Sequence, residues 1–588
     1  MRSAALLVTM LLAATAAAAP PPPEFHSISR FVSDNPALPT ELLAVDRPRS
    51  GSITGPEVRR YALDLNKGDF AVIRLDQTGG DLILNLFGPD GKLIEIIDQN
   101  TVRETETGIL VAPQSGRYIV QVAQFDWHSG ASAYSIALAK RAPLAKTAAG
   151  RADQLIDAWY DPAHPGAALA VIKDGKIVYQ RTVGLANVEQ KTPITARTPF
   201  ELASVSKQFT GYAVALLIAE GRLSRDDDVR KYLPELASLG TKVTVGQLLD
   251  HTSGLRDWDA GLAIAGLAPE HGMTVQTVLD FAARQRRLNF APGSERAYSN
   301  TGYVLLGEIV ARVTGQPADR WMAEQVFAPL GMADSRLNLD PAAIIPNKAL
   351  SYEGRNPVSL ASSTSLAVGG STSVVASLAD LVRWVAALEQ RRPGGPKVQA
   401  LLASPASLPD GRSTGYAFGQ WHQAHRGLRS IGHLGLVAGF RTRVTRFPDQ
   451  RAAIIFLSND GDDAAYARSE RIEELFIPVE PRPATEVPSD SPPDPPALLP
   501  AVTLASYTGR YCSDEMATAY VITVRGDALA AEHPLNGTVL LRRTGVDSFA
   551  SGRWYMPQLD FQRSADGRVS GFVTGTVNAR NMAFRKID

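Results

Sequence analysis

The sequence predicts a multi-domain protein in which a central α/β unit lies between two all-β domains. Residues 49–140 and 501–588 alternate between short apolar runs and turn signals, which is typical of small β-domains. Residues 149–478 instead combine strands with a long helix-rich region. Proline-rich stretches at 20–48 and 479–500 separate the three parts and are predicted to be linkers.

The first 19 residues have the layout of a secretory signal peptide. Arg2 precedes an apolar run from Ala4 to Leu12, and a tract ending in Ala17-Ala18-Ala19 follows. A membrane anchor is the alternative, but the apolar run is shorter than the ~20 residues that a spanning helix needs. We therefore expect cleavage after residue 19 and a periplasmic or secreted bacterial protein without a membrane span.

The charge balance argues against partners that are recognised by a large electrostatic field. The chain has 60 basic and 60 acidic residues and no block of like charge, so neither nucleic acid nor an anionic membrane surface is an expected partner. The single cysteine, Cys512, cannot form an intrachain disulfide. An exported protein of this kind must be held together by its hydrophobic core, and its partners are expected to be a small-molecule or peptide substrate at a local site.

The N-terminal domain is predicted to be a β-sandwich. Turn signals such as Gly79-Gly80 and Pro89-Asp90-Gly91 separate its apolar runs. The fragments LNLFGPDGKLI and APQSGRYIVQVA are similar to the small β-sandwich found in many secreted bacterial hydrolases. The predicted strands are Tyr61–Leu65, Ala71–Leu75, Leu82–Phe87, Tyr118–Val122 and Tyr134–Leu138.

The central unit begins with an amphipathic helix at 152–160 and a hairpin whose turn is Asp174-Gly175. Helical periodicity then continues from Ser204 to about Arg391. Strand patterns return in RSIGHLGLVAGFRTRVTRFP and RAAIIFLSND, and DAAYARSERIEELF predicts a closing helix. A sheet that starts before a helical block and finishes after it forms one α/β unit, so a cleft is expected between the two parts.

The C-terminal domain is predicted to be a small antiparallel barrel or sandwich. Its segments YTGRYCSDEMATAYVITVRGDALAAEHP and GRVSGFVTGTVNARNMAFRKID alternate between apolar and polar residues and contain several turn signals. We expect the two flanking β-domains to be possible contacts for polymers of the cell envelope.

Ser204 and Lys207 are candidates for a nucleophile and its base. They are three residues apart at a helix start, so both side chains share one face. A lysine that loses its proton in a dry pocket could accept the proton of the serine hydroxyl. The alternative is a solvated lysine on a helix surface, because the S-x-x-K pattern alone is common.

Tyr298 and Asn300 form the second candidate pair, in a loop just before a predicted helix. The phenol of Tyr298 could relay a proton to a leaving group, and the amide of Asn300 could bind a substrate carbonyl. The alternative is structural: a packed tyrosine, and an asparagine that caps the helix through its side-chain oxygen.

The third candidate is His433-Leu434-Gly435 on the returning strand. The histidine could donate a hydrogen bond to a substrate carboxylate, and Gly435 would let a substrate approach the backbone. A surface histidine beside a strand glycine is the alternative. His422 and His425 lack a third ligand nearby and an H-E-x-x-H motif, so neither a metal nor another cofactor is expected.

In this order, the three motifs resemble the serine β-lactamase and penicillin-binding-protein-like family. The resemblance is greatest to the branch of class C β-lactamases, D-alanyl-D-alanine carboxypeptidases and family VIII esterases. It covers about residues 150 to 478 and implies a transpeptidase fold, an antiparallel sheet with a helical subdomain. The fragments that carry it are FELASVSKQFTG, LLDHTSGL, FAPGSERAYSNTGYVLLGEIVARVTG, PLGMADS, GGSTSVVASLADLVRW and YAFGQW.

The resemblance also implies a role for each motif residue. Ser204 would be acylated, Lys207 and Tyr298 would handle protons, and the backbone amides of Ser204 and Leu436 would form the oxyanion hole. Substrate binding would involve Asn300, His433 and Gly435.

One motif departs from the family pattern, because His433-Leu434-Gly435 stands where Lys-Thr-Gly is usual. The change removes a permanent cation and a hydroxyl that together hold a substrate carboxylate. If a protonated His433 replaces that cation, kcat/KM for carboxylated substrates should fall as pH rises past a pKa near ~6.5.

These observations predict a secreted serine hydrolase that forms an acyl-enzyme on Ser204 with an ester or amide substrate, including D-amino peptides or β-lactams. The alternative is a weak or inactive β-lactamase-like binding protein of the cell envelope. An α/β-hydrolase is less consistent with the sequence. Its G-x-S-x-G motif occurs at Gly411–Gly415, where Ser413 follows a Pro-Asp turn and not a strand.

Overall fold

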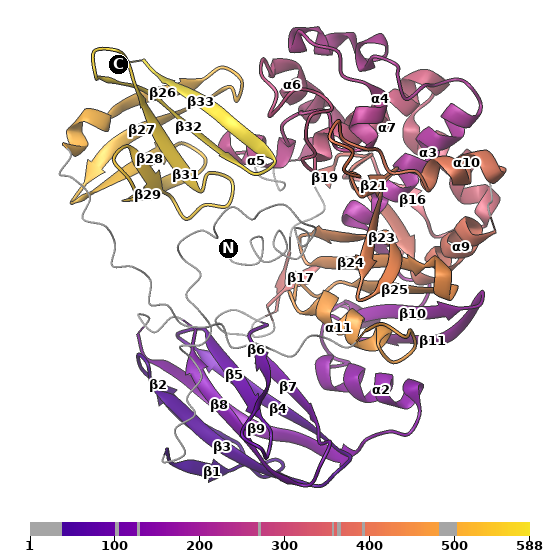
Figure 1. Ribbon diagram of the computed structural model, residues 1–588, viewed down its shortest axis with the longest axis vertical. Coiled ribbons are helices and arrows are strands. Elements are labelled where there is room, and N and C mark those ends of the chain that lie inside the picture. The colour runs from indigo at the N-terminus through magenta and orange to yellow at the C-terminus, as the bar shows by residue number, and fades with distance from the viewer. Residues whose placement is uncertain are drawn as a thin grey trace.

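The structure, a computed structural model, describes residues 38–99, 105–125, 130–267, 272–354, 358–361, 366–390, 394–480 and 503–587. The predicted signal peptide and most of the linker 479–500 lie outside these ranges. Figure 1 shows three units: a strand-rich N-terminal unit, a central α/β unit and a C-terminal barrel. The predicted arrangement of a central α/β unit between two β-rich regions is confirmed.

Two sheets form the N-terminal unit, and their apolar faces enclose a core that includes Leu63, Leu84, Val120 and Ile136. One has the strand order β1-β3-β8-β5-β6 and the other β2-β9-β4-β7. The described strands are β1 (Thr40–Leu42), β2 (Arg49–Ile53), β3 (Val58–Leu65), β4 (Asp69–Thr78), β5 (Leu82–Phe87), β6 (Leu93–Ile97), β7 (Thr105–Val111), β8 (Gly116–Gln124) and β9 (Ser132–Pro143).

The predicted linker 20–48 contains one of these strands. Thr40–Leu42 pairs in parallel with β3 at an edge of the sheet. All three residues are exposed. Because neither face of this short strand is buried, its sequence has no alternation of apolar and polar residues from which a strand could be predicted.

The central unit is built on one sheet with the strand order β11-β10-β25-β24-β23-β22-β21, in which the described pairs are antiparallel. The predicted hairpin joins β10 to β11, and both Asp174 and Gly175 have positive φ, as its tight turn requires. The strands are β10 (Ala167–Lys173), β11 (Lys176–Val183), β21 (Tyr416–Ala417), β22 (Gln420–His425), β23 (Leu428–Val437), β24 (Phe440–Phe447) and β25 (Ala452–Ser458).

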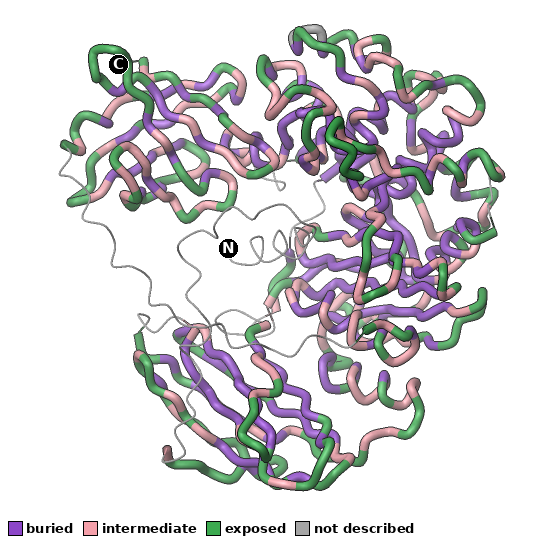
Figure 2. Tube along the Cα trace, in the orientation of Figure 1, coloured by how far each residue is buried: buried purple, intermediate pink, exposed green. Residues whose placement is uncertain are grey.

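Helices cover both faces of this sheet. On one face, α2 (Ala148–Trp159) and α11 (Ala465–Glu473) pack against alternate residues of β10 and β25. The other face packs against α3 (Ser206–Ala219) and α9 (Leu378–Glu389) within the largest core of the protein. Figure 2 shows buried residues along the central strands, with exposed residues mainly in peripheral loops.

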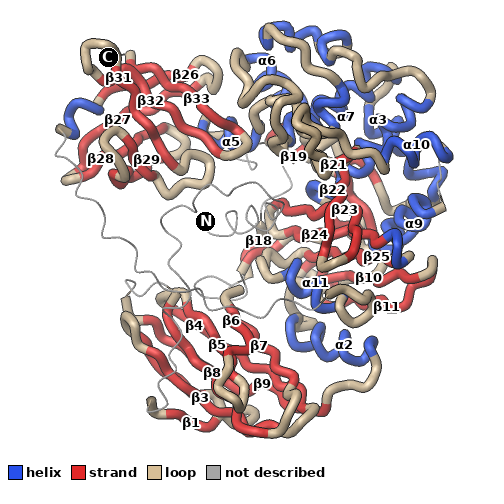
Figure 3. The backbone as a smooth tube through the Cα atoms, viewed as in Figure 1, coloured by secondary structure: helices blue, strands red, loops and turns tan. Residues whose placement is uncertain are grey.

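The helical subdomain lies between β11 and β21 in the sequence, as predicted. Figure 3 shows its helices gathered at one end of the central sheet. Besides α3 and α9, its described helices are α4 (Val245–Leu249), α5 (Trp258–Ile264), α6 (Val275–Arg284), α7 (Asn300–Thr314), α8 (Ala318–Met322) and α10 (Gly395–Leu402). Short strands connect them: β12 (Leu185–Asn187), β13 (Thr192–Pro193), β14 (Pro199–Glu201), β15 (Met273–Thr274), β16 (Arg336–Leu337), β17 (Tyr352–Glu353), β18 (Ser359–Leu360), β19 (Leu366–Ala367) and β20 (Val374–Ser377).

The C-terminal unit is a closed antiparallel barrel and not a sandwich. The first strand pairs with the last through Tyr511 and Lys586, which closes the sheet. Tyr511, Phe561 and Phe572 are among the aromatic side chains of its packed interior. Its strands are β26 (Gly509–Ser513), β27 (Thr518–Arg525), β28 (Ala528–His533), β29 (Gly537–Arg543), β30 (Ser548–Ala550), β31 (Gln558–Arg563), β32 (Val569–Thr576) and β33 (Ala579–Lys586).

Candidate active site

Ser204 lies in a tight turn at the entrance to α3. The 3₁₀ turn Ala203–Val205 runs directly into the helix, and buried Ala203 has a φ of +48°. The turn packs against β23 at Gly435, where an added Cβ would lie 2.3 Å from the carbonyl oxygen of Leu202. Gly435 therefore accommodates the backbone of the serine turn, and its expected contact with a substrate stays a prediction.

Lys207 is fully buried and points back at Ser204. Its Nζ lies 3.1 Å from Ser204 Oγ, 2.7 Å from Asn300 Oδ1 and 2.8 Å from the carbonyl oxygen of Ser371. Burial lowers the pKa of Lys207 to about 7, although the nearby carboxyls of Asp257 and Asp259 favour the protonated form. The interpretation of Lys207 as a solvated surface lysine is therefore wrong. A substantial fraction of this amine is neutral near pH 7 and can accept a proton.

Tyr298 also contacts the serine, and its hydroxyl shares a hydrogen bond with Ser204. Burial raises the pKa of Tyr298 far above its usual value, so the phenol keeps its proton. Its ring lies 4.4 Å from that of His251 and stacks parallel to Trp421, with 6.3 Å between centroids. In this state Tyr298 can donate or relay a proton but is a poor base, which leaves Lys207 as the stronger base of the pair.

Asn300 is the first residue of α7, but it is not the helix cap. Ser299 occupies the cap position and accepts a hydrogen bond from Gly302 N at 3.3 Å, so the capping interpretation of Asn300 is wrong. The Asn300 side chain instead accepts from Lys207 and donates from Nδ2 to Asp257 Oδ2 at 3.1 Å. The structure thus places Asn300 beside the predicted nucleophile and base.

His433 is buried on β23 and does not carry the expected charge. Its Nδ1 lies 2.5 Å from the Leu434 carbonyl oxygen, and its Nε2 lies 3.0 Å from the Tyr416 hydroxyl. Since a carbonyl can only accept, Nδ1 carries the hydrogen and Nε2 accepts from Tyr416. Burial, together with the positive charge of Lys207, lowers the pKa of His433 to about 3. The imidazole is therefore neutral at physiological pH. The prediction that a protonated His433 binds a substrate carboxylate at that pH is wrong.

The predicted oxyanion donors lie on two adjoining segments. Leu436 follows Gly435 on β23, which packs along the turn that contains Ser204. The Thr442 hydroxyl donates to the Leu202 carbonyl at 2.7 Å, and the Tyr466 hydroxyl donates to the Gly435 carbonyl at 2.5 Å. The first bond holds β24 to the residue before the serine turn, and the second holds β23 to α11.

Several residues of the site were missed from the sequence. Asp257 binds Asn300, and buried His251 accepts a hydrogen bond from Ser299 N at 3.1 Å through Nδ1. Ser371 supplies a carbonyl to Lys207, and Tyr416 supplies a hydroxyl to His433. The fragments LLDHTSGL, GGSTSVVASLADLVRW and YAFGQW contain three of these four residues and were quoted only as family fragments, whereas no sequence signal marks Asp257.

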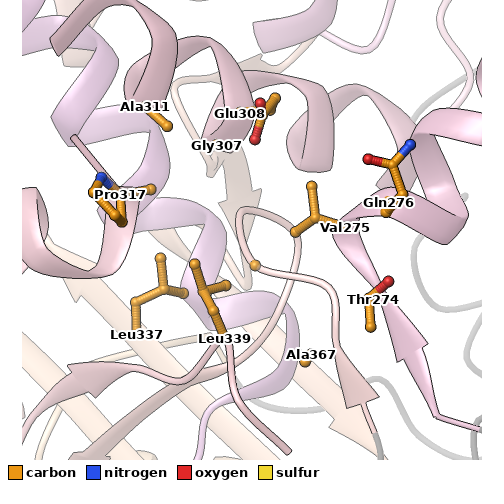
Figure 4. A pocket seen from close by; sticks show the side chains of 12 residues that line it. Thr274, Val275, Gln276, Gly307, Glu308, Ala311, Pro317, Leu337, Leu339 and Ala367 are labelled. Atoms are coloured by element: carbon orange, nitrogen blue, oxygen red, sulfur yellow. The ribbon is translucent and has the colours of Figure 1, made fainter. Parts of the chain in front are cut away.

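A separate apolar cavity lies beside α7 (Figure 4). Its volume is about 270 Å³. None of Ser204, Lys207, Tyr298 and Asn300 lines it. Its lining residues are Thr274, Val275, Gln276, Gly307, Glu308, Ala311, Pro317, Ala318, Leu337, Leu339, Ala367 and Gly369.

Two properties of the described chain bear on other types of site. Within the described ranges, no group of three or more His, Cys, Asp or Glu side chains is arranged to hold a metal ion. No helix of that part of the chain combines the length and apolar character needed to cross a membrane.

The fold and the grouping of Ser204, Lys207, Tyr298 and Asn300 define a protein of the β-lactamase and penicillin-binding type. Residues 150–477 match the family model described as Beta-lactamase, which is more than half of the chain. The chain therefore belongs to the β-lactamase family.

Curated relatives show the same similarity. A D-aminopeptidase of Cereibacter sphaeroides is 28% identical over 309 residues, which cover 52% of this chain and 58% of the relative. A D-aminopeptidase of Brucella anthropi is 29% identical over 296 residues, covering 50% and 56%. The chain thus spans less than two thirds of the length of these relatives.

Among solved structures, the octameric penicillin-binding protein homologue from Pyrococcus abyssi is 22% identical with a TM-score of 0.49, over 72% of this chain and 96% of that one. The D-amino acid amidase from Ochrobactrum anthropi is 25% identical with a TM-score of 0.47, over 55% and 98%.

Proposed function

We propose that this chain is an exported serine hydrolase that forms an acyl-enzyme on Ser204 and cleaves amide or ester bonds. The observation that carries the proposal is the buried Lys207, whose Nζ lies 3.1 Å from Ser204 Oγ and whose pKa is lowered to about 7. A neutral amine at this distance can act as a general base at physiological pH.

In the proposed acylation step, Lys207 Nζ takes the proton of Ser204 as Oγ bonds to the substrate carbonyl carbon. The backbone amides of Ser204 and Leu436 stabilise the resulting oxyanion. When the intermediate collapses, the bond to the leaving nitrogen or oxygen breaks, and the leaving atom takes a proton from Tyr298. Tyr298 in turn recovers a proton from the Lys207 ammonium. Water then attacks the acyl-enzyme, with Lys207 as base, and releases the acid and free Ser204.

For the substrate, we propose an amide bond next to a D-amino acid. The similarity to D-aminopeptidases and to a D-amino acid amidase supports this class. The neutral state of His433 supports it as well, because β23 then lacks the cation with which the family usually holds a carboxylate. Anionic β-lactams are accordingly expected to be poor substrates.

For the compartment, the layout of residues 1–19 supports export to the periplasm or the medium. The two flanking β-domains are proposed contacts for cell-envelope polymers.

The direct test compares the wild-type protein with Ser204→Ala. The wild-type enzyme should release amine from a panel of D-amino acid amides, and its intact mass should increase by one acyl group with a slowly hydrolysed ester. Ser204→Ala should lose at least about 1000-fold in kcat and show no mass increase. Ser413→Ala is the matched control, because Ser413 is exposed in a β-bridge with Ser407 and should leave turnover unchanged. Equal adduct formation in both serine variants would refute the proposal.

The pH profile tests the assignment of the base. Lys207 must be neutral to accept a proton, so kcat/KM should rise with pH through about 7 and level off above it. The pKa of His433 is about 3, so we expect no fall of kcat/KM near pH 6.5 for carboxylated substrates. A fall at that pH would contradict the neutral state of His433.

A β-lactamase-like binding protein without turnover is the competing function. Such a protein would bind D-amino peptides reversibly, and Ser204 would not be labelled by a fluorophosphonate. Labelling that depends on both Ser204 and Lys207 would exclude this alternative.

A further inference from the structure

Asp257 binds the nitrogen end of the Asn300 amide, whereas Lys207 binds the oxygen end. Asp257 is buried in the segment that leads into α5, and no step of the proposed mechanism uses it. Its Oδ2 accepts two hydrogen bonds from Asn300, one from the backbone N at 2.9 Å and one from Nδ2 at 3.1 Å. These bonds determine which end of the Asn300 amide faces Lys207.

The orientation of that amide determines where the lone pair of Lys207 points. A neutral amine has two N–H groups and one lone pair. Two acceptors lie within hydrogen-bond distance of Lys207 Nζ, namely Asn300 Oδ1 at 2.7 Å and the Ser371 carbonyl oxygen at 2.8 Å. When both N–H groups bind these acceptors, the lone pair is left for the hydroxyl of Ser204. If the Asn300 amide rotated by half a turn, its Nδ2 would face Lys207 Nζ, and Lys207 would lose one hydrogen-bond acceptor.

We propose that Asp257 is a positioning residue, which holds the Asn300 amide so that the lone pair of neutral Lys207 faces Ser204. The inference rests on the proposed function, because it assigns Asp257 a part in preparing the base of that reaction. Asp257 does not contact the reacting atoms.

The neighbouring Asp259 adds a charge contribution. Burial raises the pKa of both carboxyls, and the charge of Asp259 raises that of Asp257 further. In their charged form, both carboxyls favour protonated Lys207. The titratable groups near Lys207 are Asp257, Asp259, His251, His433, Tyr298 and Tyr303, with Arg296 close to His251.

The backbone around Asp257 is held as firmly as its side chain. Asp257 N donates to the Asn578 carbonyl of the β32–β33 turn at 3.0 Å. Asn289 Nδ2 donates to the same carbonyl at 2.8 Å, and Asn289 Oδ1 accepts from Arg580 N at 2.8 Å. These hydrogen bonds hold the Asp257 backbone in place, so its carboxyl stays in position to bind Asn300.

The first experiment separates orientation from general loss of structure. Asp257→Leu removes the acceptor for Asn300 and should lower kcat ~100-fold while KM changes less than ~3-fold, as expected for a misdirected catalytic group. Asp257→Asn keeps an acceptor oxygen and should recover kcat to within ~10-fold of wild type. Asp280→Leu, at an exposed position of α6, is the matched control and should not change kcat. Equal losses in the two Asp257 variants, or an unchanged Asp257→Leu, would overturn the inference.

The second measurement reads Lys207 directly and does not depend on turnover. In the Ser204→Ala background, lysines labelled with ¹³C at Cε are titrated by NMR, and the Lys207→Met spectrum identifies the Lys207 signal. The double variant Asp257→Asn/Asp259→Asn removes the negative charge, so the pKa of Lys207 should fall clearly below that of the parent. An unchanged Lys207 titration would refute the link between Asp257 and the base. If wild type shows no labelling of Ser204 but Lys207 still responds, the proposed function fails, and only the coupling between the two carboxyls and Lys207 is established.

Discussion

The two flanking β-domains contact the catalytic unit in different ways. The N-terminal sandwich lies behind the central sheet, where Phe70 and Val72 join α2 and the outer side of the sheet in one apolar cluster. An ion pair between Glu95 of β6 and Arg471 of α11 adds a polar contact. Figure 1 shows the sandwich next to α2, whereas the barrel lies next to α5.

The barrel instead contacts the helical subdomain close to the site. Its interior is continuous with the apolar residues around Trp258, Ile264 and Phe281. Buried Arg256, the residue before Asp257, forms an ion pair with Glu515 at 2.5 Å. It also donates to the carbonyl of Arg580 at 3.0 Å.

The difference teaches that two accessory domains of similar strand content stabilise different parts of the central unit. Contacts of the sandwich stabilise the face of the sheet that packs against α2 and α11, which is opposite to the face that packs against α3. Contacts of the barrel stabilise the segment from which Asp257 reaches Asn300. Loosening the barrel should therefore affect both stability and turnover, whereas loosening the sandwich should affect stability alone.

The largest effect is expected for Glu515→Leu. This change leaves the guanidinium of Arg256 buried without its carboxylate, which costs about 3–5 kcal/mol for buried pairs. Urea denaturation should show that loss, and kcat should fall because the neighbouring Asp257 loses its fixed position. A stable variant with wild-type kcat would show that the barrel is as independent of the site as the sandwich.

An intermediate effect is expected for Asn289→Ala. The variant removes both side-chain hydrogen bonds to the β32–β33 turn, each worth about 0.5–1.5 kcal/mol. We expect a lower thermal midpoint and a loss of about 3–10-fold in kcat. A loss confined to KM would indicate that the turn contacts substrate and does not act through Asp257.

The smallest effect is expected for Glu95→Gln. The ion pair with Arg471 is partly exposed on both sides, so its removal should cost at most about 1 kcal/mol. Turnover and the pH profile should equal those of wild type. A clear fall in kcat would contradict the comparison, because it would connect the sandwich to the site.

The sequence was sufficient where the information is local. The S-x-x-K, Y-x-N and H-x-G motifs each occupy a few consecutive residues, and the structure brings Ser204, Lys207, Tyr298 and Asn300 together. The tight hairpin at Asp174-Gly175 was predicted from its dipeptide for the same reason.

Other features depend on contacts between distant parts of the chain. The charge of His433 is determined by its burial and by the nearby positive charge of Lys207. Neither can be predicted from the H-x-G motif alone. Asp257 binds Asn300 across 43 residues of sequence. The choice between barrel and sandwich depends on whether β26 pairs with β33, at opposite ends of the domain.

The close contact at Gly435 has a consequence for how this site can vary. A methyl group at this position would lie 2.3 Å from both the Leu202 carbonyl oxygen and the Thr442 hydroxyl oxygen, so the strand could not stay against the serine turn. Any side chain at this position would therefore push the strand away from the turn that carries the nucleophile, so we expect substitutions of Gly435 to disrupt the site.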